Sequence, residues 1–247
     1  MIKQNTLARY LEPLLRGDRK SCRTVIEETL QSGIPANAVY VHLVWPVMVE
    51  IEKLLRDDKV TPVQEHLATR VNRTIVDQLQ NKLPRRASRA RRVVICCASD
   101  ESGELGGQMV ADLFESDGWE ARFLGGSVSN DDIIAYIGNF RPEVLILYGV
   151  RARCAPQVRR LIDTIRAINA CPGMRIMLSG GVFGNAEGLW EEIGADMYAC
   201  NASEAVRLAC GELQEPVKPQ RMIKQRRKKV QPEASPEAAA EPATVGA

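Results

Sequence analysis

The chain has 247 residues, of which 45% are hydrophobic and 26% are charged, a composition typical of a globular protein with a buried core. Its formal net charge of +2 is too small to indicate a nucleic-acid or membrane partner by itself. No apolar stretch approaches the ~20 residues that span a bilayer, and the first residues lack the apolar segment of a secretory signal. We therefore expect a cytoplasmic protein that does not enter a membrane.

The first third of the sequence is expected to be helical throughout. Asp18 and Thr61 are well placed to cap the second and fourth of four predicted helices, because their side chains can accept from backbone amides of the first turn. The third helix is predicted over about 36–56, with a kink at Pro46. Four helices joined by short turns predict a helical bundle cap domain over residues 1–83.

Two segments have the composition of exposed chain. The segment Lys82–Arg92 contains Pro84 and six basic residues, so residues 84–92 are predicted to form an exposed basic linker. Residues 214–247 begin with a basic stretch and end in Pro, Ala and Glu, a composition that cannot bury a core. We predict that this tail is disordered and that any nucleic-acid contact would be made by its basic stretch.

From Val93 onward, apolar strands alternate with amphipathic helices, which predicts an α/β domain with a parallel sheet over residues 93–213. The strands are predicted at about 93–98, 120–124, 144–148, 175–179 and 196–199, and the helices at about 105–117, 130–139, 155–168, 185–193 and 202–213. The first and third strands are wholly apolar, as interior strands are, whereas the second alternates like an edge strand. This pattern predicts the flavodoxin-like (Rossmann-like) strand order 2-1-3-4-5, with a ligand crevice over the ends of strands one and three.

The loops that follow these strands are rich in glycine. The predicted loop 100–104 follows strand one, Gly125 follows strand two, Tyr148-Gly149 ends strand three, and Ser179-Gly180-Gly181 ends strand four. Glycine allows a backbone to lie close against a broad, flat ligand. Glycine pairs also occur merely to form tight turns, and both interpretations remain open at this point.

The sequence resembles the cobalamin-binding domain family, in which a four-helix cap precedes the α/β domain. The matching stretches are Glu101–Gly106, Gly118–Trp119, Phe123–Gly125, Arg141–Val144, Leu178–Gly181 and Gly194–Ala199, with Trp45–Pro46 and Val60–His66 in the helical part, where they resemble the light- and cobalamin-sensing regulators. The resemblance implies a tetrapyrrole site between the cap and the strand ends. It covers roughly Leu7 to Leu213.

Three positions depart from the family pattern. Gly103 stands where the family's cobalt-binding histidine is expected, and glycine has no side-chain donor. Tyr148 replaces a serine that contacts the lower nucleotide tail of the cofactor, and a tyrosine would occupy the space that the tail normally threads. Leu55 stands in the place of the tryptophan that covers the upper face in the sensor branch. Some relatives that lack the histidine bind heme or a bilin instead.

The resemblance also assigns candidate site residues. They are Glu65, His66, Glu101, Ser102, Gly103, Gly106, Gly125, Tyr148, Gly149, Ser179, Gly180 and Gly181. Because neutral imidazole is a common metal ligand, His66 is a candidate ligand to iron or cobalt from the cap side; the alternative is a hydrogen-bonded histidine of the cap.

These observations favour a non-enzymatic sensory or regulatory protein that binds a tetrapyrrole (heme, a bilin or cobalamin) and acts through a protein partner in transcriptional control. The alternatives are a corrinoid carrier protein of a methyltransferase system and a ligand-free scaffold, and self-association stays open. A phosphoacceptor receiver domain is rejected, because strand three ends in Tyr148-Gly149 without an aspartate. No nucleophile, base and orienting group can be assembled, so no catalytic site is predicted.

Overall fold

The structure is a computed structural model that describes residues 2, 4–98, 101–169, 171–184 and 188–213, without the side chains of residues 4 and 101–103. The predicted disordered tail, residues 214–247, lies outside the described residues. None of the helices within the described ranges is long and apolar enough to cross a membrane.

The N-terminal part is helical, as predicted. It consists of α1 (Gln4–Leu15), α2 (Arg19–Gln31), α3 (Ala36–Val39), the π-helical turn η1 (Tyr40–Val44), α4 (Trp45–Arg56) and α5 (Pro62–Gln80). Asp18 caps α2 by accepting from the Ser21 backbone amide, and Thr61 forms a reciprocal capping box with Gln64 at the start of α5. Both predicted caps are therefore confirmed.

The predicted third helix is divided by a π-helical turn. Pro46 has no N–H to donate to the carbonyl of His42, so α-helical hydrogen bonding fails at this point. The chain widens by one residue directly before the proline, and the Trp45 amide bonds to the Tyr40 carbonyl, five residues back. π-helical turns of this kind are rare and tend to occur where a helix is perturbed.

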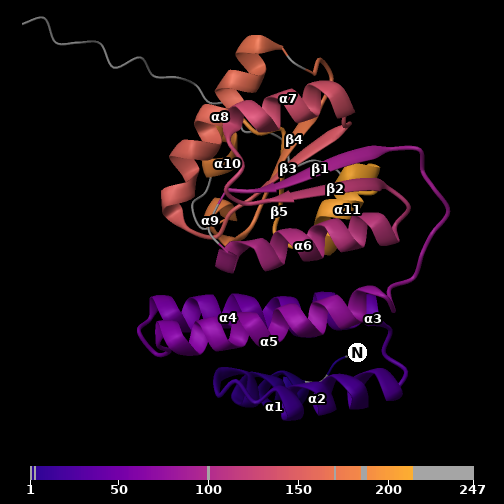
Figure 1. Ribbon diagram of the computed structural model, residues 1–247, viewed down its shortest axis with the longest axis vertical. Helices are drawn as coiled ribbons and strands as arrows, with labels where there is room; N and C mark the ends of the chain where they lie inside the picture. The colour runs from indigo at the N-terminus through magenta and orange to yellow at the C-terminus, as the bar shows by residue number, and fades with distance from the viewer. Residues whose placement is uncertain (1, 3, 99–100, 170, 185–187, 214–247) are drawn as a thin grey trace, which may run out of the picture. The chain divides into compact units, whose positions relative to one another are not determined.

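The α/β part is a parallel sheet in the order β2-β1-β3-β4-β5, which confirms the predicted topology (Figure 1). Its strands are β1 (Arg92–Cys97), β2 (Glu120–Gly125), β3 (Val144–Tyr148), β4 (Arg175–Ser179) and β5 (Met197–Ala199). Its helices are α6 (Glu101–Ser116), α7 (Asn130–Phe140), the 3₁₀ turn η2 (Ala152–Cys154), α8 (Ala155–Ile168), α9 (Gly181–Gly184), α10 (Leu189–Ile193) and α11 (Ala202–Cys210).

Three helices differ from the prediction by three residues or more, and one of them is α11, which ends at Cys210 rather than near residue 213. Helix α6 begins at Glu101, so the expected loop as far as Glu104 is wrong. The three glycines of α6 lower its intrinsic helix propensity. Packing against the rest of the protein overrides that preference. The predicted helix over 185–193 is replaced by α9 and α10, and residues 185–187 lie outside the described residues.

The two faces of the sheet contribute to different hydrophobic cores, because successive side chains of a strand point to opposite faces. Ile95 of β1 and Ile146 of β3 belong to a core that also contains α6, α11 and the cap helices. Cys96 and Leu147, the next residues, belong to a core that contains α7, α8 and α10. Figure 1 accordingly shows α6 between the sheet and the cap helices α4 and α5.

The segment predicted as a basic linker is exposed, as expected, but it is also tied to the end of α6. The backbone amide of Arg86 donates to the Ser116 carbonyl (2.9 Å), and that of Arg89 donates to the Gly118 carbonyl (2.8 Å). Both guanidinium groups pair with the buried carboxylate of Asp117. These contacts fix the path of the chain between the cap and β1.

A buried polar group joins the cap to α6. The Tyr40 hydroxyl lies 2.8 Å from the Val76 carbonyl and 3.0 Å from the Asp112 carboxylate. The Gln80 amide donates to the other oxygen of Asp112 at 3.1 Å. Burial of the carboxylate raises the pKa of Asp112 to about 6, since desolvation disfavours the charged form.

The raised pKa predicts how stability at this junction depends on pH. A carboxyl group whose pKa is higher in the folded state contributes stability below its ordinary pKa and loses it as the pH rises through about 6. Asp112→Asn cannot ionise, so its free energy of unfolding should rise relative to that of the wild type by about 1–3 kcal/mol between pH 4 and pH 7.5. Urea unfolding at four pH values measures the difference. Val25→Ala, a core substitution that does not titrate, should run parallel to the wild type, and a parallel course for Asp112→Asn would contradict the prediction.

Candidate functional site

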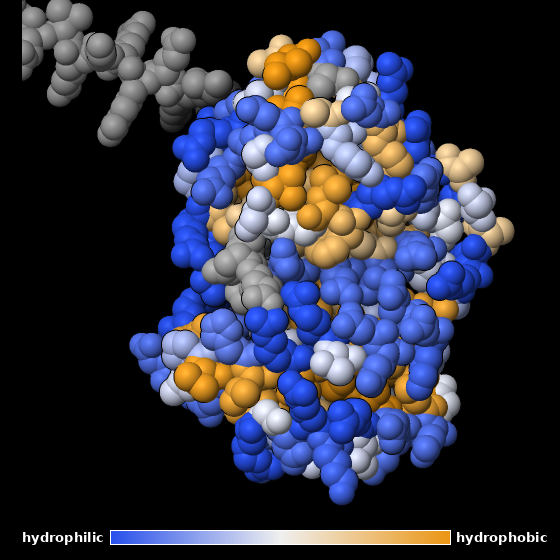
Figure 2. All heavy atoms as spheres, viewed as in Figure 1, coloured by the Kyte–Doolittle hydropathy of each residue, from blue (hydrophilic) through white to orange (hydrophobic). Residues whose placement is uncertain are grey.

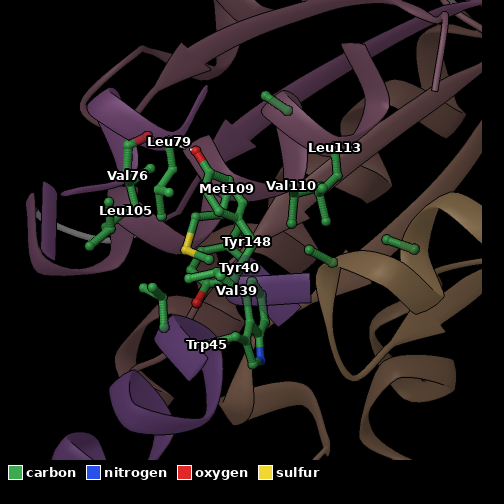
Figure 3. Packing of buried hydrophobic residues seen from close by; sticks show 14 of the residues in the cluster. Val39, Tyr40, Trp45, Val76, Leu79, Leu105, Met109, Val110, Leu113 and Tyr148 are labelled. Carbon is green, nitrogen blue, oxygen red and sulfur yellow. Dashed lines mark hydrogen bonds between the residues drawn. The ribbon is translucent and has the colours of Figure 1, made fainter. Parts of the chain in front are cut away.

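The ends of β1 and β3 are closed on the cap side by the side chain of Tyr148. This residue ends β3, is only 3% exposed, and packs edge-on against Trp45 at a ring distance of 6.1 Å. Its hydroxyl lies against Gly106, where even a methyl group would overlap it. Figure 3 shows Tyr148 and Trp45 among the buried side chains of α6 and the cap. Tyrosine, tryptophan and glycine together fill the space between the strand end, α6 and the cap.

Other glycines at the strand ends are also explained by contacts inside the protein. Gly180 has a φ of +104°, and a side chain there would overlap the backbone of Gly149. Gly107 lies against the Cys97 thiol in the same way. Gly125 has a φ of +70°, a conformation that L-residues with side chains rarely adopt. Close packing of the protein on itself therefore accounts for these glycines without a ligand.

Charged groups of the cap meet the strand ends beside this packed centre. Glu104 of α6 accepts from the Gly126 amide at 2.7 Å and pairs with Arg73 of α5 at 3.6 Å. The Arg73 guanidinium has two buried nitrogen atoms without a hydrogen-bond acceptor, so the ion pair with Glu104 offsets part of the cost of burying its charge. The contact links α5, α6 and the loop after β2.

Two carboxylates of the cap lie close together near the loop after β4. Glu65 of α5 is buried and accepts from the Thr69 hydroxyl at 3.0 Å. Glu52 of α4 has a carboxylate oxygen 3.7 Å from the position that a Cβ of Gly181 would take. Burial, together with the charge of Glu65, raises the pKa of Glu52 to about 7, against the opposing effect of the positive charges of Arg56 and Arg151.

The remaining predicted site residues are exposed, form hydrogen bonds with other parts of the protein, or lie outside the described residues. His66 is exposed, although its neighbour Glu65 is buried, because consecutive residues of a helix point about 100° apart. The buried Ser179 hydroxyl donates to the Ala199 carbonyl at 3.0 Å. The side chains of Glu101 and Ser102 lie outside the described residues, as any side chain at Gly103 would. Among the described residues, no three His, Cys, Asp or Glu side chains could hold a metal ion.

A cleft of about 510 Å³ lies on the opposite side of the sheet, where α7 and α8 begin. We call it the α7/α8 cleft. Its lining residues are Cys96, Cys97, Ala98, Ser127, Val128, Asn130, Ile133, Leu147, Arg153, Cys154, Gln157, Val158 and Leu161. The sequence predicted a crevice over the ends of strands one and three but did not assign these lining residues to a site, because they come from four separate segments that share no motif. The one available signal was the predicted crevice at the point where the strand order reverses.

Comparisons with known proteins agree with the fold. Two family models, both described as B12 binding domains, match residues 6–80 and 91–207. The dimethylamine corrinoid protein 1 of Methanosarcina acetivorans is 25% identical over 137 residues, which are 54% of this chain and 63% of that protein. The chain thus matches less than two thirds of this relative's length. The monomethylamine corrinoid protein of Methanosarcina barkeri superposes with a TM-score of 0.76 at 17% identity, covering 86% of this chain and 100% of that one.

The comparisons support the fold predicted from the sequence but not the predicted function. They confirm the flavodoxin-like domain with its helical cap. They give no support to heme, a bilin, a sensory role or transcriptional control. Both relatives are named as corrinoid proteins.

The contact between Tyr148 and Gly106 makes a prediction about stability. Gly106→Ala should lower the free energy of unfolding by about 1–3 kcal/mol, because the new methyl group overlaps the tyrosine. In a Tyr148→Ser background the same change should cost nothing, since the obstacle is gone. Gly138→Ala, a helical glycine of α7 with open space around it, is the matched control and should stabilise by about 0.5–1 kcal/mol. A cost for Gly106→Ala that is equal in both backgrounds would refute the contact.

The pKa of Glu52 predicts a second pH effect, at the strand ends. Its stabilising contribution is present below its ordinary pKa and is lost as the pH rises through about 7. Glu52→Gln should therefore gain about 1–3 kcal/mol in unfolding free energy relative to the wild type between pH 5 and pH 8, whereas Val49→Ala on the same helix should follow the wild-type profile. Carboxyl NMR titration measures the group directly, and Glu65→Gln should lower the pKa of Glu52. An unchanged value in that variant would show that the two carboxylates do not interact.

Proposed function

Because the chain belongs to the B12-binding domain family, we propose that it is a non-catalytic corrinoid-binding protein that presents its cofactor to a partner methyltransferase. The observation that supports this is the joint presence of the helical cap and the five-stranded domain. The same combination extends over 100% of the monomethylamine corrinoid protein, which it matches with a TM-score of 0.76. The corrinoid would lie at the C-terminal edge of the sheet, next to the cap.

The residues present do not fit a corrinoid held in the family's histidine-ligated mode. Gly103 offers no donor atom for cobalt. On the cap side of the sheet, Tyr148 is packed against Gly106 and Trp45, so the space that the resemblance assigns to the nucleotide tail is filled by protein. We therefore propose binding without a cobalt ligand at position 103 and derive no chemical step on the metal.

The residues that would hold the macrocycle are those that the structure gathers at the strand ends. Amide side chains surround a corrin ring, and the carboxylates of Glu52 and Glu65 are suited to accept hydrogen bonds from them. Gly181 presents backbone close to the Glu52 carboxylate. In this proposal the corrinoid supplies the methyl-transfer chemistry, while the protein supplies binding and orientation.

Cobinamide, a corrinoid without a nucleotide tail, tests the proposal, because any nitrogen ligand to its cobalt must come from the protein. The wild-type chain should co-elute with cobinamide in gel filtration, and the reduced Co(II) form should show no nitrogen splitting in its EPR spectrum. Gly103→His should introduce that splitting and tighten binding by about tenfold, or ~1.4 kcal/mol. Gly138→His, on the distant helix α7, should do neither.

The other outcomes separate the competing functions. Nitrogen splitting in the wild type that disappears in His66→Ala would assign the ligand to His66 on the cap and overturn binding without a protein ligand. Uptake of hemin or biliverdin in place of a corrinoid would favour the tetrapyrrole sensor over a carrier. If no tetrapyrrole co-elutes with the protein, the corrinoid proposal fails and the ligand-free scaffold is favoured.

A further inference from the structure

We propose that the α7/α8 cleft receives the nucleotide end of the corrinoid, on the face of the sheet opposite Tyr148. This inference rests on the proposed function. Three properties of the cleft support it: its position, the chemistry of its lining residues and its volume. A fourth argument is that Tyr148 fills the corresponding space on the cap side of the sheet.

The position of the cleft is set by the alternation of side chains along β1 and β3. Cys97 and Tyr148 belong to the core on the cap side, whereas Cys96 and Leu147, one residue earlier, belong to the other core. Cys96 and Leu147 line the cleft, and Cys97 also borders it at the end of β1, whereas Tyr148 does not line it. Both faces of the sheet adjoin the edge formed by the C-terminal ends of β1 and β3. A ligand placed across this edge can therefore extend to either face, and Tyr148 blocks one of them.

The lining of the cleft combines an apolar floor with a polar rim. Buried side chains form the floor, namely Cys96, Ile133, Leu147, Val158 and Leu161. Burial raises the pKa of the Cys96 thiol to about 12, so this residue stays neutral and acts as a small hydrophobe. On the face drawn in Figure 2, hydrophobic side chains reach the surface over the part of the molecule that contains α7 and α8.

The rim carries groups that recognise a phosphorylated sugar. Ser127, Asn130, Arg153 and Gln157 line the cleft and are all exposed. Among the lining residues that the structure describes, Arg153 is the one cation and none is a carboxylate, so the charge of these residues favours an anionic ligand. The nucleotide end of a corrinoid carries an anionic phosphate, a ribose with hydroxyl groups and a planar base with apolar faces. Arg153 is suited to the phosphate, the amides of the rim to the ribose, and the floor to the base.

The volume of the cleft is also large enough for a nucleotide. At about 510 Å³ it lies within the range of about 300–1,000 Å³ that is usual for small-molecule sites. By contrast, the cap side of the strand ends is filled where Gly106 meets the Tyr148 hydroxyl. The structure thus provides room for a nucleotide on the face where the family resemblance does not place it.

Binding isotherms of the full chain with cobalamin and with cobinamide test the inference, since the two ligands differ by the nucleotide end. The wild type should bind cobalamin about tenfold more tightly than cobinamide, a difference of ~1.4 kcal/mol. Arg153→Gln and Gln157→Trp should each weaken cobalamin binding about three- to tenfold and leave the cobinamide dissociation constant within about twofold. Arg160→Gln, an exposed arginine of α8 outside the cleft lining, is the matched control and should change neither constant.

Methyl NMR locates the contact independently of affinity. Signals of Ile133, Leu147 and Val158 should shift on addition of cobalamin and stay in place on addition of cobinamide. Equal affinity of the wild type for both ligands, or equal losses for both in Arg153→Gln, would overturn the inference while leaving corrinoid binding intact. If the wild type binds neither ligand, the proposed function itself fails, and the inference falls with it.

Discussion

The contact of Tyr148 with Gly106 and Trp45 is the interaction on which the arrangement of the strand ends depends. It joins three elements that are far apart in the chain: the end of β3, the first turns of α6, and the start of α4. Tyr148 is the residue that contacts both of the others. Glycine is required at position 106 because a Cβ would overlap the hydroxyl, and the buried tyrosine ring packs edge-on against the indole of Trp45. Dense packing of this kind changes in discrete steps rather than continuously.

This contact also determines which chemistry the site can support. A large ring filling the cap side of β3 leaves charged groups only at its margin, where Glu104 pairs with Arg73 and Glu52 lies near Glu65. Two carboxylates in a partly desolvated place attract hydrogen-bond donors and positive charge. They do not form a metal site within the described part of the chain. In the proposed corrinoid-binding role, these carboxylates would accept hydrogen bonds from the amide side chains of the macrocycle.

Much of the fold could be predicted from sequence because its signals are local. The apolar run Val144–Tyr148 marks an interior strand, and Thr61 with Gln64 marks a helix start, whatever the rest of the chain does. The beginning of α6 could not be predicted in this way. Gly106 and Gly107 disfavour a helix locally, and only contacts with Tyr148 and Cys97 from other strands explain them. Local propensity and tertiary packing conflict at this point, and packing prevails.

The candidate site was predicted less completely, for a related physical reason. The residues at the strand ends follow from the strand order, and the structure does gather Glu65, Gly106, Tyr148 and Gly181 in one region. The direction of a side chain depends instead on helical phase and strand register: Glu65 is buried and His66 exposed, although they are adjacent. The α7/α8 cleft depends on register in the same way, since a shift of one residue along β1 would turn the Cys96 side chain to the cap side of the sheet. Register thus decides which face of the sheet is filled by Tyr148 and which is open, and the single step from Leu147 to Tyr148 separates the two.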